Sequence, residues 1–284
     1  MNILVTGGAG FVGTNLIKRL LKDGHNVVSL DNYSTGTEEN HQEGCEYVDA
    51  DIRDVIDFSY FMEKPDVIYH LGAIARIQPS FVNPAPTLET GILGTMNVLE
   101  WVRELENKPK LIFAGSSSVH SGKLKNPYTF SKNVADDMCM LYREHFDVDV
   151  SICRFYNVYG PHQLTEGEYC TVVGIFERQY KEGVELTITG DGEQRRDFTH
   201  IDDIVEGLIL TSESETSHKT IELGRGQNHS INELAEMFGC GFTYIPERPG
   251  EAKITLCDTS EAFVKIGYKP KVNIEDYVKE IINE

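Results

Sequence analysis

The chain has 284 residues and a formal net charge of −19, because 45 Asp and Glu outnumber 26 Lys and Arg. This balance excludes a nucleic-acid-binding surface, which needs clustered basic side chains, and no stretch approaches the roughly 20 apolar residues of a membrane span. The N-terminus has no signal-peptide pattern, and the six cysteines form no Cys-x-x-Cys pair. We therefore expect a cytoplasmic protein with buried thiols and no metal site.

The first half of the chain alternates short apolar, β-branched runs with segments of helical length. The runs cover 3–6, 26–30, 45–48, 67–71, 111–114 and 151–155, and the helical segments cover 11–23, 55–64, 90–107 and 127–146. Strands that alternate with helices indicate βαβ units and a parallel sheet covered on both faces. The pattern predicts an α/β fold with a Rossmann-type doubly wound parallel sheet.

The second half is less regular, and its clearest strand candidates are Leu186–Thr189 and Thr220–Leu223. Gly160-Pro161 marks a domain boundary, since Pro after Gly stops the preceding element. We predict a nucleotide-binding domain over 1–160 and a smaller, irregular α/β substrate domain over 161–284. Some segments of the second part are expected to return to the first.

A glycine-rich turn, G-G-A-G-F-V-G over 7–13, follows the first predicted strand and opens the first predicted helix. Glycines there let backbone N–H groups approach a pyrophosphate, and the helix N-terminus adds partial positive charge. The alternative is a plain strand–helix turn. We predict a dinucleotide site, with contacts from Gly7, Gly10, Phe11, Val12 and Gly13.

Asp31 ends the second predicted strand, 18 residues after Gly13. A carboxylate there accepts hydrogen bonds from the adenosine ribose hydroxyls and repels a 2′-phosphate, which favours NAD over NADP. The alternative is a capping or turn residue beside Asn32, which we also expect near the cofactor. Asp51 and Ile52 follow the third strand and are expected beside the adenine.

Tyr and Lys stand four residues apart twice, as Tyr60…Lys64 and Tyr128…Lys132. On a helix such a pair shares a face, and a neighbouring ammonium favours the phenolate that a base requires. The first pair ends a predicted helix at the N-terminal edge of the sheet, whereas ligands bind at the carboxyl edge. We therefore predict Tyr128 as the base, with Lys132 as its partner, and no role for Tyr60.

The fifth predicted strand runs into Gly115-Ser116-Ser117-Ser118. On an extended chain Ser116 and Ser118 face the same way, so a hydroxyl can relay a proton between substrate and phenol. The alternative is that these serines only satisfy backbone groups in a turn.

With these elements in order, the chain resembles the extended short-chain dehydrogenase/reductase family, in particular its NAD-dependent nucleotide-sugar epimerase/dehydratase branch. The resemblance covers nearly the whole chain. Its blocks are 7–13, 51–53, 70–73, 94–100, Tyr128…Lys132, 154–161, 190–192, 196–198, 202–203 and 248–251.

The resemblance implies that NAD is the cofactor and that the catalytic residues are Ser116, Tyr128 and Lys132. The nicotinamide side would be lined by Leu71, Gly72, Ala73 and Ala75, with Tyr156 packed near the ring. The substrate would be a nucleotide-diphospho-sugar, bound by Ser116, Ser118, Asn157, Arg196 and Arg248. Arg suits a diphosphate because its planar fork pairs with phosphate oxygens; the alternative for each Arg is a surface ion pair.

Three departures from the family pattern stand out. Gly91 occupies the place where the family usually has Asn, and Ala75 stands where some epimerases carry Lys. The loop over 118–127 is shorter than in most relatives, which reshapes the roof of the pocket.

The leading hypothesis is an NAD-dependent epimerase that oxidises the sugar transiently, at C4, and returns hydride to the opposite face. A 4,6-dehydratase is less favoured, because its relatives place Asp-Glu directly after the active-site hydroxyl, where this chain has Ser117-Ser118. A decarboxylase or a reductase of the same family remains an alternative. The alternative from another class is a non-catalytic NAD-sensing protein.

A homodimer through helices 90–107 and 127–146 is also predicted, since in relatives the matching helices pack against a second copy. The apolar residues offered for this contact are Leu93, Met96, Val98, Leu99, Val134, Met138 and Leu141. The alternative is that they all pack on the chain's own sheet.

Overall fold

The computed structural model describes residues 1–54, 57–62 and 64–284. Seven strands form one sheet in the order β11-β6-β5-β4-β1-β2-β3, with every neighbouring pair parallel. The predicted Rossmann-type doubly wound sheet is confirmed. The strands are β1 (Asn2–Thr6), β2 (Asn26–Asp31), β3 (Cys45–Asp49), β4 (Val67–His70), β5 (Lys110–Ser116), β6 (Val150–Phe155) and β11 (Thr220–Leu223).

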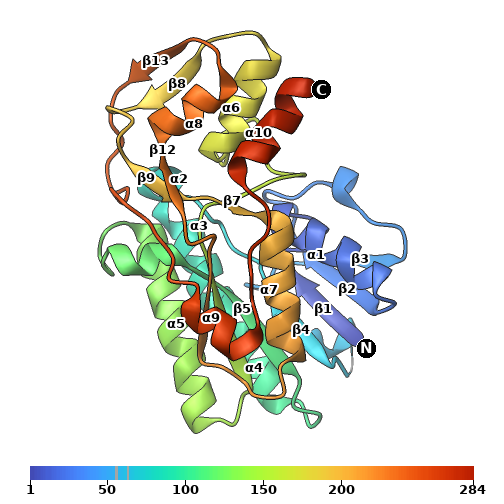
Figure 1. Ribbon diagram of the computed structural model, residues 1–284. Helices are drawn as coiled ribbons and strands as arrows, with labels where there is room; N and C mark the ends of the chain where they lie inside the picture. The colour runs from blue at the N-terminus through green and yellow to red at the C-terminus, as the bar shows by residue number, and fades with distance from the viewer. Residues whose placement is uncertain (55–56, 63) are drawn as a thin grey trace.

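Helices cover both faces of this sheet (Figure 1). On one face lie α1 (Phe11–Lys22), α7 (Ile201–Glu213) and α9 (Ser260–Ile266), whose apolar residues share a core with Ile3 and Val5 of β1. On the other face, α4 (Thr95–Glu104) and α5 (Pro127–His145) pack over Leu4, Ile68 and Leu111. The inner strands β1, β2, β4, β5 and β6 are largely buried, as a doubly covered parallel sheet requires, whereas the edge strand β3 is partly exposed.

Two of the predicted helices differ from expectation. Over 55–64 the described residues form only a 3₁₀ turn, η2 (Phe58–Tyr60), so the longer helix is wrong there; residues 55, 56 and 63 lie outside the described residues. Phe58 is fully buried and packs against Trp101, which holds a single turn in place. The helix predicted over 90–107 begins as a π-helical turn, η3 (Glu89–Gly94), and then continues as α4.

The connections at the carboxyl edge contain further short elements. They are η1 (Glu38–Asn40), α2 (Ile77–Val82), α3 (Pro84–Leu88), η4 (Ser117–Ser121), β7 (Val158–Tyr159), β9 (Arg195–Asp197), β10 (Thr199–His200) and β12 (Asn228–Ser230). β10 pairs with β7, and β12 pairs with β9.

A second core lies beyond this edge. It is built by α6 (Val172–Lys181), β8 (Leu186–Thr189), α8 (Ile231–Phe238), β13 (Phe242–Ile245) and α10 (Ile274–Asn283). β11, α7 and α9 also come from the second half of the chain, yet they complete the seven-stranded sheet and its covering. The domain boundary at 160 remains a prediction. Within the described residues, the helices lack the length and apolar character needed to cross a membrane.

His70 joins three elements at the carboxyl edge. Its Nδ1 lies 2.7 Å from Oγ1 of Thr6 at the end of β1, and its Nε2 lies 3.1 Å from Oγ1 of Thr95 at the start of α4. The ring is almost fully buried, and this burial lowers the pKa of His70 to about 3. The neutral imidazole therefore holds the ends of β1 and β4 together.

We expect the free energy of unfolding to decrease as the pH falls below about 6.5 toward 3. The unfolded chain binds a proton at His70 near pH 6.5, whereas the folded protein resists protonation until about 3. The unfolded state thus binds more protons in this window, and this group costs about 1.4 kcal/mol of stability per pH unit. Urea unfolding should show that the difference in free energy of unfolding between wild type and His70→Asn becomes smaller as the pH falls, because only wild type loses this contribution. A constant difference between about pH 7.5 and about pH 5 would contradict this.

Candidate active site

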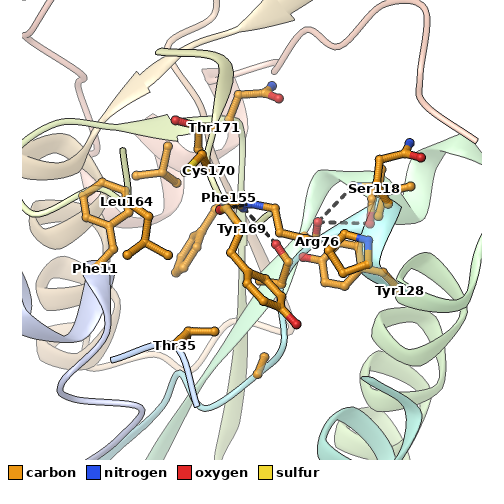
Figure 2. Close-up of a pocket in the computed structure, with 18 of the residues that line it drawn as sticks. Phe11, Thr35, Arg76, Ser118, Tyr128, Phe155, Leu164, Tyr169, Cys170 and Thr171 are labelled. Atoms are coloured by element: carbon orange, nitrogen blue, oxygen red, sulfur yellow. Dashed lines mark hydrogen bonds between the residues drawn. The ribbon is translucent and has the colours of Figure 1, made fainter. Parts of the chain in front are cut away.

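A cavity of about 490 Å³ opens at the carboxyl edge of the sheet, between the two cores. Its walls come from the glycine turn, the loops after β4 and β5, the start of α5 and the second half of the chain. Figure 2 shows side chains from these segments converging on one space. In an open α/β sheet this edge, where the strand order reverses between β1 and β4, is where ligands bind.

The glycine turn leaves space for a ligand at the N-terminus of α1. A Cβ on Gly13 would lie 2.3 Å from the carbonyl oxygen of Gly7, so close backbone packing requires Gly there. A Cβ on Gly10 would meet only that same oxygen, at 3.4 Å, and would project into free space. Gly10 is also the N-cap of α1, which has neither a side-chain cap nor an acidic residue in its first turn. The free N–H groups of this helix start suit a dinucleotide diphosphate.

The adenosine end of the cavity is lined by Asp31, Asn32 and Ile52. The Asp31 carboxylate accepts hydrogen bonds from the N–H groups of Ala9 (2.9 Å) and Tyr33 (2.8 Å), and burial raises its pKa. A carboxylate has about four acceptor positions, so two remain for ribose hydroxyls. The residues therefore fit the ribose of a dinucleotide.

Asp51 is held beside this wall rather than in it. Its carboxylate pairs with Arg53 at 2.6 Å and accepts a hydrogen bond from Asn32 Nδ2 at 2.8 Å. The Arg53 hydrogen bonds lower the pKa of Asp51 to about 2. Asp51 thus orients Asn32, which does line the cavity.

Ser116, Ser118 and Tyr128 all line the cavity, and Figure 2 shows Ser118 and Tyr128 close to each other in its wall. Ser116 Oγ donates to Ser118 Oγ at 3.0 Å and accepts the Ser118 N–H at 3.2 Å. Ser116 also interacts with the Tyr128 phenol and favours its ionised form. Burial raises the pKa of Tyr128, and the Ser116 hydroxyl and the Arg76 charge partly offset this. The arrangement can pass a proton between a bound hydroxyl and the phenol.

Lys132 lies behind the cavity wall. Its Nζ donates to the carbonyl oxygen of Ala114 at 2.7 Å and sits 4.9 Å from the centre of the Phe113 ring. Burial lowers the pKa of Lys132 to about 8. The structure therefore ties this ammonium to β5, and the charge of Arg76 also lowers the pKa of Tyr128; Lys132 as the partner of Tyr128 stays a prediction.

Leu71, Gly72, Ala73 and Ala75, which the family pattern assigns to the nicotinamide side, line the cavity, whereas Tyr156 does not. Tyr156 is 5% exposed, and its hydroxyl donates to Glu222 at 3.0 Å, away from this cavity. Phe155 lines the cavity instead. Successive residues of an extended chain face opposite sides, so only one of the two can reach the ligand. Phe155 rather than Tyr156 therefore faces this cavity, and a nicotinamide packed near Tyr156 stays a prediction.

Asn157, Arg196 and Arg248 line the far end of the cavity. Arg196 pairs with Glu251 at 3.2 Å, while Arg248 is exposed at the rim. Asn157 donates to Asp197 O (3.0 Å) and Thr255 Oγ1 (2.9 Å), which fixes its amide.

Sequence reasoning missed several lining residues, which are Arg76, Gln78, Phe155, Tyr169 and Cys170. Arg76 follows directly on Ala75, and that adjacency was the available signal. The segment with Tyr169 has no periodic pattern that could have been read. The departure at Gly91 has a packing reason, since a Cβ there would lie 2.9 Å from the Cβ of Ser131.

The profile of the NAD dependent epimerase/dehydratase family matches residues 3–224. The chain belongs to this family, and fold and site together define an NAD-dependent nucleotide-sugar enzyme of the epimerase/dehydratase type.

Two curated relatives represent different reactions. A putative UDP-glucose 4-epimerase of Methanocaldococcus jannaschii is 30% identical over 99% of this chain and 97% of its own. UDP-glucuronic acid decarboxylase 1 of Xenopus tropicalis is 32% identical over 99% of this chain and 71% of its own.

Two solved structures are similar over the full length of this chain. The UDP-glucose 4-epimerase of Thermotoga maritima with UDP-glucose has a TM-score of 0.93, 29% identity and coverage of 100% of this chain and 98% of its own. The UDP-glucuronic acid 4-epimerase of Bacillus cereus, in complex with UDP-glucuronic acid and NAD, has a TM-score of 0.89, 29% identity and the same coverage.

We expect Gly10→Ala to weaken NAD binding by at least about tenfold, with a melting temperature close to wild type. The Gly10 backbone (φ −82°, ψ 176°) suits any residue, so the added methyl group obstructs only the ligand. Gly13→Ala is the matched comparison and should destabilise the fold by about 1–3 kcal/mol, because its methyl group meets backbone. Thermal unfolding and calorimetry with NAD separate the two. If Gly10→Ala bound NAD as tightly as wild type, the diphosphate of NAD would not lie against Gly10.

We expect Tyr128→Phe to reduce turnover by about 10²–10⁴-fold or more while nucleotide-sugar binding stays nearly intact. The phenyl ring preserves packing, and only the proton-transfer group is lost. The rate of NAD reduction at saturating sugar measures this step. Tyr60→Phe is the control, because Tyr60 also stands four residues before a Lys, and it should leave the rate of NAD reduction nearly unchanged. A Tyr128→Phe enzyme that reduced NAD at the wild-type rate would remove Tyr128 from the role of base.

Proposed function

We propose that this protein is an epimerase of nucleotide-diphospho-hexoses that inverts the configuration at C4. The observation that carries the proposal is the Ser116–Tyr128 hydroxyl pair, which opens into the same cavity as the glycine turn. Positions 117 and 118 beside it hold Ser, so the carboxylates that a dehydratase uses there to eliminate water are missing.

In this mechanism Tyr128 exchanges one proton with the C4 hydroxyl, in opposite directions in the two half-reactions. Ser116, which interacts with the Tyr128 phenol, holds the substrate hydroxyl beside it. Bound NAD supplies the hydride acceptor and the hydride donor. Arg196 and Arg248 anchor the diphosphate, which leaves the sugar ring free to present either face to the same phenol. Inversion requires both that the diphosphate stays bound and that the sugar ring can turn over in the cavity.

A decarboxylase of a nucleotide-diphospho-hexuronic acid is the second candidate, favoured by the similarity to the Xenopus tropicalis enzyme. Oxidation at C4 is the first step of both reactions, so both need Ser116 and Tyr128. The reactions diverge only in whether the carboxylate is lost before hydride returns. The product therefore decides between them.

We expect the protein to convert a nucleotide-sugar into its C4 epimer without net NADH formation. UDP-, dTDP-, GDP- and CDP-linked hexoses and hexuronic acids should be incubated with the protein and NAD, and the products read by NMR. Arg248→Ala should weaken substrate binding with less effect on the chemical step, the opposite of Tyr128→Phe. A pentose product with CO₂ would establish the decarboxylase, and a 4-keto-6-deoxy product would establish a dehydratase.

We also propose that the protein is a homodimer through α4 and α5. Val98 and Leu99, predicted for this contact, are fully buried against the chain's own sheet and serve the monomer core instead. Leu93, Met96 and Leu141 remain 39–49% exposed. An exposed apolar group of this kind on adjacent helices is typical of an interface.

We expect a dimer mass in light scattering at micromolar concentration. Met96→Glu with Leu141→Glu should shift it to a monomer, because each charge would be buried without a partner at the interface. Val264→Glu on α9, where Val264 is 81% exposed, is the control and should leave the mass unchanged. A wild-type monomer would contradict the proposal.

A reducing compartment, and thus the cytoplasm, is the location that we propose. All six cysteines are free thiols, and Cys139, Cys153 and Cys257 are buried. Burial raises the pKa of these three thiols, which keeps them protonated and unreactive.

A further inference from the structure

Arg76 connects the two halves of the protein across the cavity. Its Nε donates to the carbonyl oxygen of Tyr169, and its Nη1 donates to that of Ala75 at 2.8 Å. Figure 2 shows its side chain between Tyr169 and Tyr128, and it interacts electrostatically with the phenol of Tyr128. Arg76 thus lies at the reacting end of the cavity.

The charge of Arg76 has no carboxylate partner among the residues that the structure describes. Among residues 1–54, 57–62 and 64–284, no Asp or Glu lies within ion-pair distance of its guanidinium, although the chain carries 45 acidic residues. The titratable groups that interact with it are Tyr128 and Cys170, and neither of them is a carboxylate. Arg196, in the same cavity, is paired with Glu251. A deeply placed cation without an anion is costly, unless a ligand supplies the anion.

The guanidinium also has hydrogen-bond donors left for a ligand. It carries five N–H donors in a planar fork, and the two carbonyl oxygens occupy one on Nε and one on Nη1. Nη2 has no hydrogen-bond partner in the described part of the chain. Since Arg76 lines the cavity and keeps accessible surface, these donors can bind both oxygens of a carboxylate.

We propose that Arg76 binds a carboxylate on the sugar, so that the substrate is a nucleotide-diphospho-hexuronic acid. This inference rests on the proposed function, because it takes the C4 hydroxyl to lie at Tyr128. The carbon that bears C6 is the ring neighbour of C4, so the C6 group lies beside the phenol, where Arg76 is. The diphosphate has its own cations at the far end of the cavity, Arg196 and Arg248.

The test compares a glucuronic acid and a glucose linked to the same nucleotide, the one that the panel above selects, since the two differ only at C6. Wild type should bind the glucuronic acid about 10–100-fold more tightly. Arg76→Gln should lose this preference while its affinity for the glucose form changes little. Arg76→Lys should keep part of the preference for the glucuronic acid, since the positive charge remains but the planar guanidinium is lost. Arg19→Gln, on an exposed Arg of α1, is the control for the loss of one charge.

Calorimetric dissociation constants, measured in the Tyr128→Phe background with NAD bound, report the preference without turnover. A wild-type preference for the glucose form would overturn the inference. So would an Arg76→Gln variant that lost turnover of both sugars equally, with a shifted pH profile, because Arg76 would then act on Tyr128 alone. Loss of NAD affinity with unchanged sugar preference would assign Arg76 to the cofactor and overturn it too.

The proposed function and this inference fail in different ways. Preference for the glucuronic acid together with a pentose product and CO₂ would refute the epimerase and support the carboxylate site. Epimerisation of the glucose form with no preference for the acid would support the epimerase and refute the carboxylate site.

Discussion

The site depends on the close contact between the turns that leave β1 and β4. Gly7 has φ +73°, and a Cβ on it would lie 2.8 Å from the backbone nitrogen of Gly72, so neither turn can move outward to accept a side chain. Thr6 Oγ1 accepts the Gly72 N–H at 3.1 Å and also bonds to His70. Because these contacts are backbone or fully buried, they set the position of the α1 N-terminus and of the nicotinamide wall at once. The other walls of the cavity are built against these two turns.

Electrostatics then divide the cavity by function. The chain as a whole is strongly acidic, with a net charge of −19, yet the cavity presents cations where anionic groups of a substrate would lie. At the end lined by Asp31 the sign is reversed, because this carboxylate is an acceptor for ribose hydroxyls and repels an anion. At the reacting end, burial raises the pKa of Tyr128 and the charge of Arg76 lowers it. A binding groove with alternating sign of this kind orients an elongated, charged ligand in one direction.

The two halves of the chain contribute unequal parts of the chemistry. The Rossmann-type half supplies the helix terminus, the hydroxyl pair and the phenol, all on rigid elements of the sheet edge. The second half supplies Arg196, Arg248 and the carbonyl oxygen of Tyr169, largely from short strands and loops. Proton transfer needs positions held to fractions of an ångström, whereas a diphosphate is bound by long, adaptable arginines. The division thus follows the precision that each task requires.

Local patterns were sufficient for the elements and for much of the site. The strands and the glycine turn followed from periodicity and glycine spacing, and the fold order placed Tyr128 rather than Tyr60 at the ligand edge. Tertiary packing decided the rest. It placed Phe155 instead of Tyr156 against the cavity, bonded Lys132 to Ala114 and brought Arg76 to Tyr169, 93 residues away in the chain. A sequence pattern reports which face of an element is buried, but it carries no information on which distant loop lies opposite. That choice is made only when the two halves close on each other.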